Sequence, residues 1–144
     1  MLFACNFNRV RSPMAEGLLK KLAGNRIFVD SCGLRQETGE EAQGADPFTR
    51  EVMAEIGVAL DGHAPKTFDE LEDDSFDLVI SLTPEAQHRA VELTRGRAVE
   101  IEYWPTFDPT LTEGSREARL AAYRAVRDSL SRRIAERFGD PAAG

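Results

Sequence analysis

The chain has 144 residues, 42% of them hydrophobic, and a formal net charge of -7. This length and composition suit one domain with a single core. The acidic balance argues against nucleic-acid binding, which depends on Lys and Arg meeting phosphates, and no apolar run approaches the roughly 18 residues of a membrane span.

Short apolar runs, which predict buried strands, alternate with helical patterns along the chain. We expect strands at 1–5, 27–31, 76–80 and 99–103, and helices at 13–23, 47–57, 84–96 and 116–138. Helix N-caps are favoured by the residue types at Ser12, Asp46, Thr83 and Ser115, and the first three of these precede a proline. The polar segment 33–45 is expected to be a loop, and residues 140–144 a flexible tail after a domain of residues 1–139.

This order of elements predicts an α/β fold, a three-layer sandwich in which helices cover both faces of a parallel sheet. In such sheets, ligands bind beyond the carboxyl ends of the strands. Four segments fall at such ends, namely 5–12, 31–33, 81–83 and the loop after Tyr103. We therefore expect these segments to converge on one site.

The first of these segments contains a cysteine, five intervening residues, an arginine and a serine, in the order Cys5-Asn6-Phe7-Asn8-Arg9-Val10-Arg11-Ser12. Five residues allow the chain to curl so that backbone N–H groups point at an anion, and the following helix adds its positive end. The Arg11 guanidinium can grip two phosphate oxygens in a fork. Ser12 can cap the helix and donate a hydrogen bond to the Cys5 sulfur. These surroundings favour a nucleophilic thiolate at Cys5, and the alternative is a buried, inert cysteine.

A phosphoryl group transferred to sulfur leaves behind an oxygen that needs a proton. Asp108 is the candidate acid, because it lies in a loop after the fourth predicted strand and Pro109 stiffens that loop. The alternative is an aspartate that only begins a turn.

The sequence resembles the low-molecular-weight protein tyrosine phosphatases and their relatives, the thioredoxin-coupled arsenate reductases, over nearly its whole length. The resemblance is carried by residues 5–16, Ser31-Cys32-Gly33, Gly57 with His63, 76–80 and Asp108-Pro109. It implies a four-stranded parallel sheet of order 2-1-3-4.

The same resemblance implies roles for individual residues. Cys5 matches the nucleophile that forms a cysteinyl-phosphate, Arg11 the residue that stabilises the transition state, and Asp108 the general acid. Phosphate would lie in the loop formed by Asn6, Phe7, Asn8, Arg9, Val10, Arg11 and Ser12. Asn8, Ser12 and His63 match residues that support this loop by hydrogen bonds, and the family implies no metal and no organic cofactor. The expected activity is phosphomonoester hydrolysis of a phosphorylated protein or small ester, in the cytoplasm.

Three departures from the family pattern bear on the substrate. Phe7 stands where a glycine is usual, and it either forms an apolar wall or packs against a neighbouring helix. Val10 stands where a second cysteine often protects the nucleophile. Thr110 and Leu111 replace the tyrosine that commonly follows Asp-Pro, which weakens the case for phosphotyrosine.

Two alternatives to hydrolysis follow from these observations. The chain could be an arsenate reductase, but the segment 81–88 lacks the cysteines of a thiol relay, so an external thiol donor would be required. It could also be a module that binds phosphate without turnover.

Three further residues have two interpretations each. Cys32 is either a small packed residue or a resolving thiol for oxidised Cys5. His63 either orients the loop or lies free on the surface. Arg9 is either a basic rim for the substrate or an ordinary exposed arginine.

Overall fold

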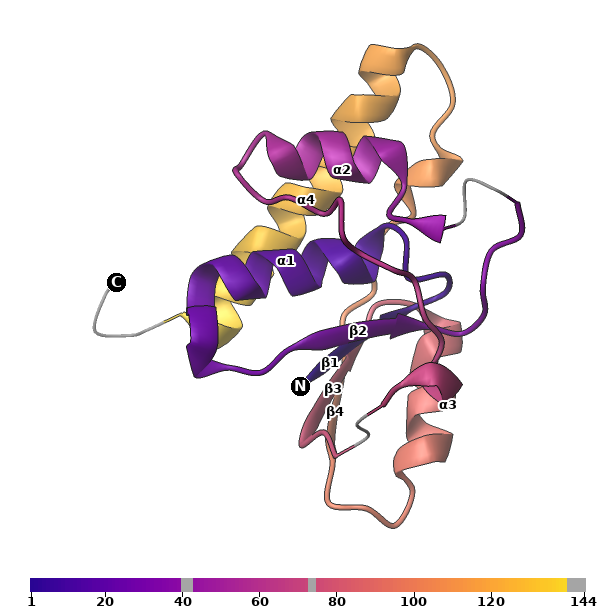
Figure 1. Cartoon of the computed structure of the whole chain (residues 1–144), viewed down its shortest axis with the longest axis vertical. Helices are drawn as coiled ribbons and strands as arrows, with labels where there is room; N and C mark the ends of the chain where they lie inside the picture. Colours follow the sequence, from indigo (N-terminus) through magenta and orange to yellow (C-terminus); the bar gives the residue numbers. More distant parts are fainter. Residues whose placement is uncertain (40–42, 73–74, 140–144) are drawn as a thin grey trace.

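The computed structural model describes residues 1–39, 43–72 and 75–139 (Figure 1). Its strands are β1 (Leu2–Cys5), β2 (Asp30–Gly33), β3 (Leu78–Ser81) and β4 (Glu100–Tyr103). Its helices are α1 (Arg11–Ala23), α2 (Pro47–Ala54), α3 (Pro84–Thr94) and α4 (Arg116–Phe138). Single 3₁₀ turns lie at η1 (Gly24–Arg26), η3 (Phe68–Glu70) and η4 (Pro109–Leu111). The expected tail, 140–144, falls outside the described residues.

The four strands form one parallel sheet in the order β2-β1-β3-β4, which confirms the order implied by the family resemblance. Leu2 pairs with Asp30 on one side and with Val79 on the other. Because all strands run the same way, the segments that follow β1, β2, β3 and β4 leave the sheet at one end.

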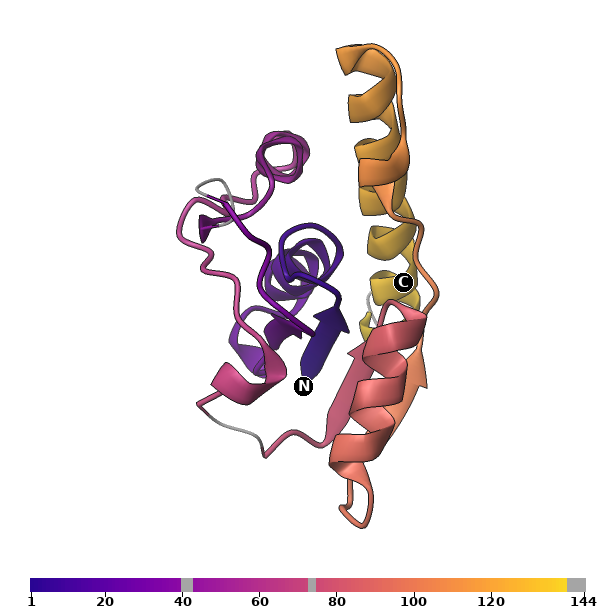
Figure 2. The same ribbon diagram turned by 90° about the vertical axis from the view of Figure 1, so that its right-hand side faces the viewer.

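Helices cover both faces of this sheet, as predicted. Phe3 and Cys5 face α1 and α4, and Leu2 and Ala4 face the layer of α3, because successive side chains of a strand point to opposite faces. Figure 2 shows α3 on the opposite side of the strands from α1. The larger core lies between the sheet, α1 and α4, and α2 packs on α4.

Two strands begin later than their apolar runs predicted. The run 27–31 contains β2 only from Asp30, and the run 76–80 contains β3 only from Leu78. The reason is that β1 itself begins at Leu2, whose partner in β2 is Asp30, so residues 27–29 have no strand to pair with. Val29 is nevertheless buried by packing rather than by sheet pairing, whereas Phe28 is 69% exposed.

Three of the four predicted helix caps are confirmed. The side chains of Asp46, Thr83 and Ser115 accept hydrogen bonds from backbone N–H groups in the first turns of α2, α3 and α4. The prediction for Ser12 is wrong, because α1 begins one residue earlier, at Arg11, and its N-cap is Val10. The Ser12 hydroxyl is therefore available to the loop before the helix.

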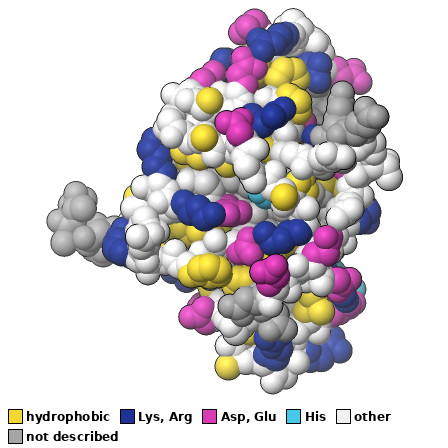
Figure 3. Space-filling model, viewed as in Figure 1, with side chains coloured by type: hydrophobic (Ala, Val, Ile, Leu, Met, Phe, Trp, Pro, Cys, Tyr) yellow, Lys and Arg dark blue, Asp and Glu magenta, His cyan; other side chains and the backbone are white. Residues whose placement is uncertain are grey.

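Charged side chains of both signs are interspersed over the face seen in Figure 3. None of the helices in the described part of the chain is both long and apolar enough to cross a bilayer.

Glu55, just beyond α2, joins that helix to α4 through Arg124 and Arg127, each 2.7 Å from a Glu55 carboxylate oxygen. Hydrogen bonds from Arg124 and then Arg127 lower the pKa of Glu55 from 4.5 to about 2. A lowered folded-state pKa stabilises the fold above pH 4.5, and this contribution is lost as the pH falls towards 2. We expect Glu55→Gln to lower the free energy of unfolding at neutral pH by up to about 1 kcal/mol, the upper end for exposed ion pairs.

Urea unfolding of the two proteins at a series of pH values tests this expectation. The difference between them should shrink as the pH falls from 4.5 towards 2. Glu136→Gln is the matched control, because the same charge is removed from an exposed position of α4 that forms no ion pair within the described residues. A difference that does not change with pH would contradict the role given to the carboxylate.

Candidate active site

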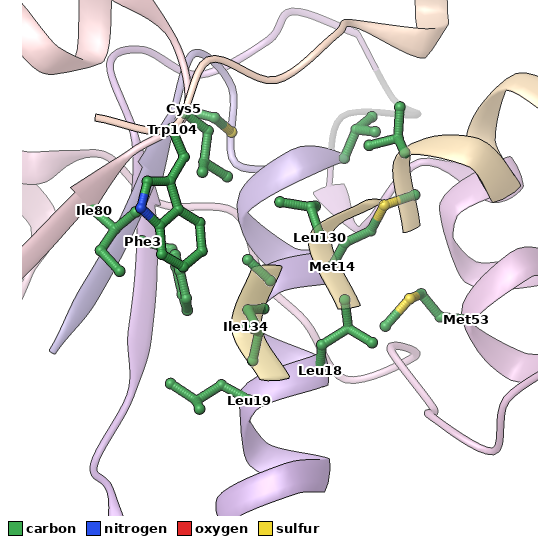
Figure 4. Close-up of a cluster of buried hydrophobic side chains, with 14 of the residues drawn as sticks. Phe3, Cys5, Met14, Leu18, Leu19, Met53, Ile80, Trp104, Leu130 and Ile134 are labelled. Atoms are coloured by element: carbon green, nitrogen blue, oxygen red, sulfur yellow. The ribbon is translucent and has the colours of Figure 1, made fainter. Parts of the chain in front are cut away.

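Cys5 is the last residue of β1, and the loop to α1 begins directly after it. Cys5 Sγ and Ser12 Oγ lie 2.9 Å apart, within hydrogen-bond distance. Cys5 is 3% exposed and belongs to the larger core cluster, part of which is drawn in Figure 4. The sulfur thus sits where the strand ends and the positive end of α1 begins, and the predicted contact with Ser12 is present.

Asn8 connects this loop to three other segments. Its side-chain amide donates to Ser12 Oγ at 2.8 Å and to Ser31 Oγ at 2.9 Å. Its Oδ1 accepts from the Lys66 backbone N–H at 3.0 Å, and its backbone carbonyl lies 2.8 Å from His63 Nε2. Asn8 also has a positive φ of 58°, a conformation that Asn tolerates better than most residues. His63 is therefore in contact with the loop and not a free surface histidine.

Gly33, at the end of β2, lies directly against the loop. A Cβ atom here would lie 2.8 Å from Asn6 O, Asn8 N and Phe7 C. Just after it, the backbone N–H groups of Leu34 and Arg35 donate to the Asn6 carbonyl. This contact was not among the predicted supports, and the glycine after the second strand was the only signal for it in the sequence.

Arg11 and Asp108 come together across 97 positions of sequence because both lie at the same end of the sheet. Arg11 Nη1 donates to the Thr106 carbonyl at 3.0 Å, and Arg11 Nη2 lies 3.8 Å from Asp108 Oδ2. The other carboxylate oxygen, Oδ1, accepts from the backbone N–H and the hydroxyl of Thr110. Asp108 thus begins a turn with one oxygen while the other faces Arg11, so the two interpretations of this residue are compatible.

Both interpretations of Arg9 are wrong. Arg9 is buried, its Nε donates to the Gly44 carbonyl at 2.9 Å, and its Nη1 pairs with Glu37 at 2.6 Å. The backbone N–H of Asp46 also donates to the Arg9 carbonyl. Arg9 therefore ties the segment after β2 to the loop instead of standing at its rim.

The remaining loop side chains have different partners. Asn6 Oδ1 accepts from Thr83 Oγ1 at 2.7 Å, and Val10 is buried in the core. Phe7 is 36% exposed, and the Arg35 guanidinium lies over its ring, 5.5 Å from the centre. An arginine rather than a helix is therefore the partner the structure gives to Phe7.

Cys32 and Cys5 lie on opposite faces of the sheet. Cys32 pairs in register with Ala4, and both belong to the smaller core cluster, with Phe76 and Ala86. The Cys32 side chain is fully buried, and this burial raises the pKa of its thiol far above the ordinary value. The structure supports packing, rather than redox exchange with Cys5, as the role of Cys32.

The described residues contain no group of three or more His, Cys, Asp or Glu side chains placed to hold a metal ion. At the carboxyl end of the sheet, the Cys5 thiol lies within hydrogen-bond distance of Ser12 in the first turn of α1, and Arg11 of the same turn faces the Asp108 carboxylate. A thiol at a helix N-terminus, in a parallel α/β fold, is typical of a class of cysteine-dependent enzymes.

The chain belongs to the low molecular weight phosphotyrosine protein phosphatase family, whose model matches residues 1–137. An arsenate reductase of Halalkalibacterium halodurans is 33% identical over 132 residues, which are 92% of this chain and 89% of that protein. A glutaredoxin arsenate reductase of Synechocystis is 30% identical over 134 residues, which are 93% of this chain and 92% of that protein. The low molecular weight protein tyrosine phosphatase of T. tengcongensis superposes with a TM-score of 0.75 over 95% of each chain, and its 24% identity shows the shared fold alone.

The contact of Gly33 with the loop predicts that Gly33→Ala will weaken oxyanion binding. The added Cβ would lie 2.8 Å from three loop backbone atoms, so the loop must move. We expect the free energy of unfolding to fall by about 1–3 kcal/mol, as in other overpacked sites, and the affinity for inorganic phosphate to fall with it. Gly62→Ala is the matched control, because a Cβ there would meet no atom within 4 Å. Unchanged phosphate affinity in Gly33→Ala, measured by calorimetry, would contradict the supporting role of Gly33.

Proposed function

We propose that this protein reduces arsenate at Cys5 and takes its electrons from an external thiol. The observation that carries the proposal is the placement of the two cysteines: Cys5 lies in the oxyanion loop, and Cys32 is sealed on the other face of the sheet. The curated relatives named above, which are called arsenate reductases, support this activity over hydrolysis.

In the first step, the loop holds arsenate by its backbone N–H groups and by Arg11. The Cys5 thiolate attacks arsenic and an S–As bond forms, while the As–O bond to an arsenate hydroxyl breaks; this hydroxyl takes a proton from Asp108 and leaves as water. Ser12 lies within hydrogen-bond distance of the sulfur and can stabilise its charge. Asp108 suits the role of acid because its Oδ2 points towards Arg11, which would bind the same anion.

In the second step, an external thiolate attacks the Cys5 sulfur. The electron pair of the S–As bond passes to arsenic, which is reduced from As(V) to As(III) and leaves as arsenite. Cys5 is left in a mixed disulfide, and a second external thiol releases it. The proposal needs an external donor because the segment 81–88 lacks the cysteines of a thiol relay, and because Cys32 and Cys5 lie on opposite faces of the sheet.

Phosphomonoester hydrolysis is the second candidate function. Asp108 favours it, since a carboxylic acid beside Arg11 can protonate the oxygen of a leaving alcohol and then activate water against a Cys5-phosphate. The family to which the chain belongs is described by this activity. Both reactions share the attack by Cys5 and differ in what resolves the covalent intermediate. Phosphate binding without either reaction is the third possibility.

We expect arsenate to stimulate the oxidation of glutathione or of reduced glutaredoxin by the purified protein. Cys5→Ser should abolish this oxidation, whereas Cys32→Ser should retain it, because Cys32 does not face the loop. The consumption of thiol and the release of arsenite are the measurements, and turnover of an aryl phosphate by the same samples tests the second candidate. Failure with every thiol donor, or equal rates in Cys5→Ser, would refute arsenate reduction.

Asp108→Asn should slow whichever reaction is found by roughly 10²–10⁴-fold, the range for a lost general acid. Asparagine keeps an Oδ1 acceptor for Thr110, so the turn should survive while the acid is lost. Asp69→Asn is the control, because Asp69 is highly exposed and lies in η3. A full rate in Asp108→Asn would remove Asp108 from the mechanism.

A further inference from the structure

One side of the loop that holds Cys5 is covered by residues 33–37. Backbone N–H groups of Leu34 and Arg35 donate to the Asn6 carbonyl at 2.8 and 3.2 Å. Glu37 accepts from Arg9 Nη1 at 2.6 Å, so the far end of the segment is also attached to the loop. Because both ends are held, the backbone of this segment lies beside the loop.

Arg35 is the exposed cation of this segment, and it differs from Arg9 and Arg11 in facing no carboxylate among the residues that the structure describes. Its guanidinium lies 5.5 Å from the centre of the Phe7 ring, and none of the described carboxylates forms an ion pair with it. Arg9, by contrast, is paired with Glu37, and Arg11 is bonded to Thr106 and faces Asp108. Arg35 therefore offers an unneutralised positive charge next to the loop.

A guanidinium stacked on a ring keeps its N–H edge available for a planar anion. A carboxylate is the ligand that matches this edge in two hydrogen bonds. The chain as a whole carries a net charge of -7, which repels acidic molecules. The Arg35 cation, which lies next to the loop through its contacts with Asn6 and Phe7, offsets that repulsion locally.

We propose that Arg35, stacked on Phe7, is a specificity-determining residue that selects a small thiol donor carrying carboxylates, of the chemical type of glutathione. This inference rests on the proposed function, since it names the donor for the same site. The carboxylate binds the guanidinium edge while the thiol of the donor reaches Cys5. The bound donor thiolate attacks the Cys5 sulfur, the S–As electron pair passes to arsenic, and arsenite leaves.

The test uses disulfide exchange, which requires no arsenate. The Cys5 thiolate attacks a small disulfide, a Cys5 mixed disulfide forms, and one thiolate of the probe leaves. The probes are oxidised glutathione, which is anionic, and cystamine, which is cationic, and mass spectrometry measures the modification of Cys5. Cys5→Ser serves as the blank.

We expect Arg35→Gln to lower the ratio of the glutathione rate to the cystamine rate by about two- to fivefold, the size expected for one exposed charge pair. Arg35→Glu should lower this ratio further, and added salt should shrink the difference. Arg132→Gln, which removes the same charge from an exposed position on α4, should leave the ratio unchanged. A ratio that is the same in Arg35→Gln as in wild type, or that falls equally in Arg132→Gln, would overturn the proposal.

A second measurement separates this proposal from the proposed function. In the arsenate assay, Arg35→Gln should raise KM for glutathione and leave KM for arsenate unchanged, and Arg35→Lys should restore part of the glutathione affinity. If the exchange ratio depends on Arg35 but the protein does not reduce arsenate, the proposed reductase activity is refuted and the recognition of acidic groups by Arg35 stands. If the protein reduces arsenate but Arg35→Gln leaves KM for glutathione unchanged, the role of Arg35 in binding the donor is refuted and the reductase activity stands. Preference for a reduced redox protein over glutathione, unaffected by Arg35→Gln, would likewise refute it.

Discussion

The side chain of Asn8 links three parts of the chain that are distant in sequence, and the geometry around Cys5 depends on it. A backbone at positive φ turns the loop, and the amide of the same residue binds Ser12 and Ser31. Each bond is buried, where an unsatisfied polar group costs about 1–3 kcal/mol. The network therefore favours one loop conformation strongly, and it holds the Ser12 hydroxyl beside the sulfur.

Arg9, Arg11 and Arg35 lie near the loop in three different environments. Each environment allows a different role. Arg9 is buried and neutralised by Glu37, so it stabilises the loop and its neighbouring segment. Arg11 faces Asp108 at a distance of 3.8 Å, too long for a tight pair and short enough for both to contact one bound anion. Arg35 is exposed and stacked on Phe7. Charge type alone would not distinguish them, because burial and partners determine what each can bind.

The sheet also separates the two thiols. Successive residues of a parallel strand face opposite layers, so Cys32, in register with Ala4, shares a face with α3, whereas Cys5 shares a face with α1. A one-residue shift in this register would place both sulfurs on one face. Strand pairing therefore decides that the two thiols of this chain face different layers.

Local sequence was sufficient to predict the parallel α/β fold, three of the helix caps and the segment that holds Cys5 and Arg11. These features depend on residues close together in the chain: alternating apolar and helical runs, a cap before a proline, a cysteine and an arginine six positions apart. The strand starts at Asp30 and Leu78 were predicted wrongly. A strand begins where a neighbouring strand is available for pairing, and the hydrophobicity of a run does not show where that neighbour begins.

Tertiary structure alone decided the surroundings of the loop. The burial of Arg9 against Glu37, the close packing of Gly33 on the loop and the position of Arg35 over Phe7 all join residues 25 to 28 positions apart. Such contacts arise because parallel strands bring their carboxyl ends to one edge of the sheet. The sequence by itself determined which groups can do chemistry, and the register of the sheet decided which of those groups meet.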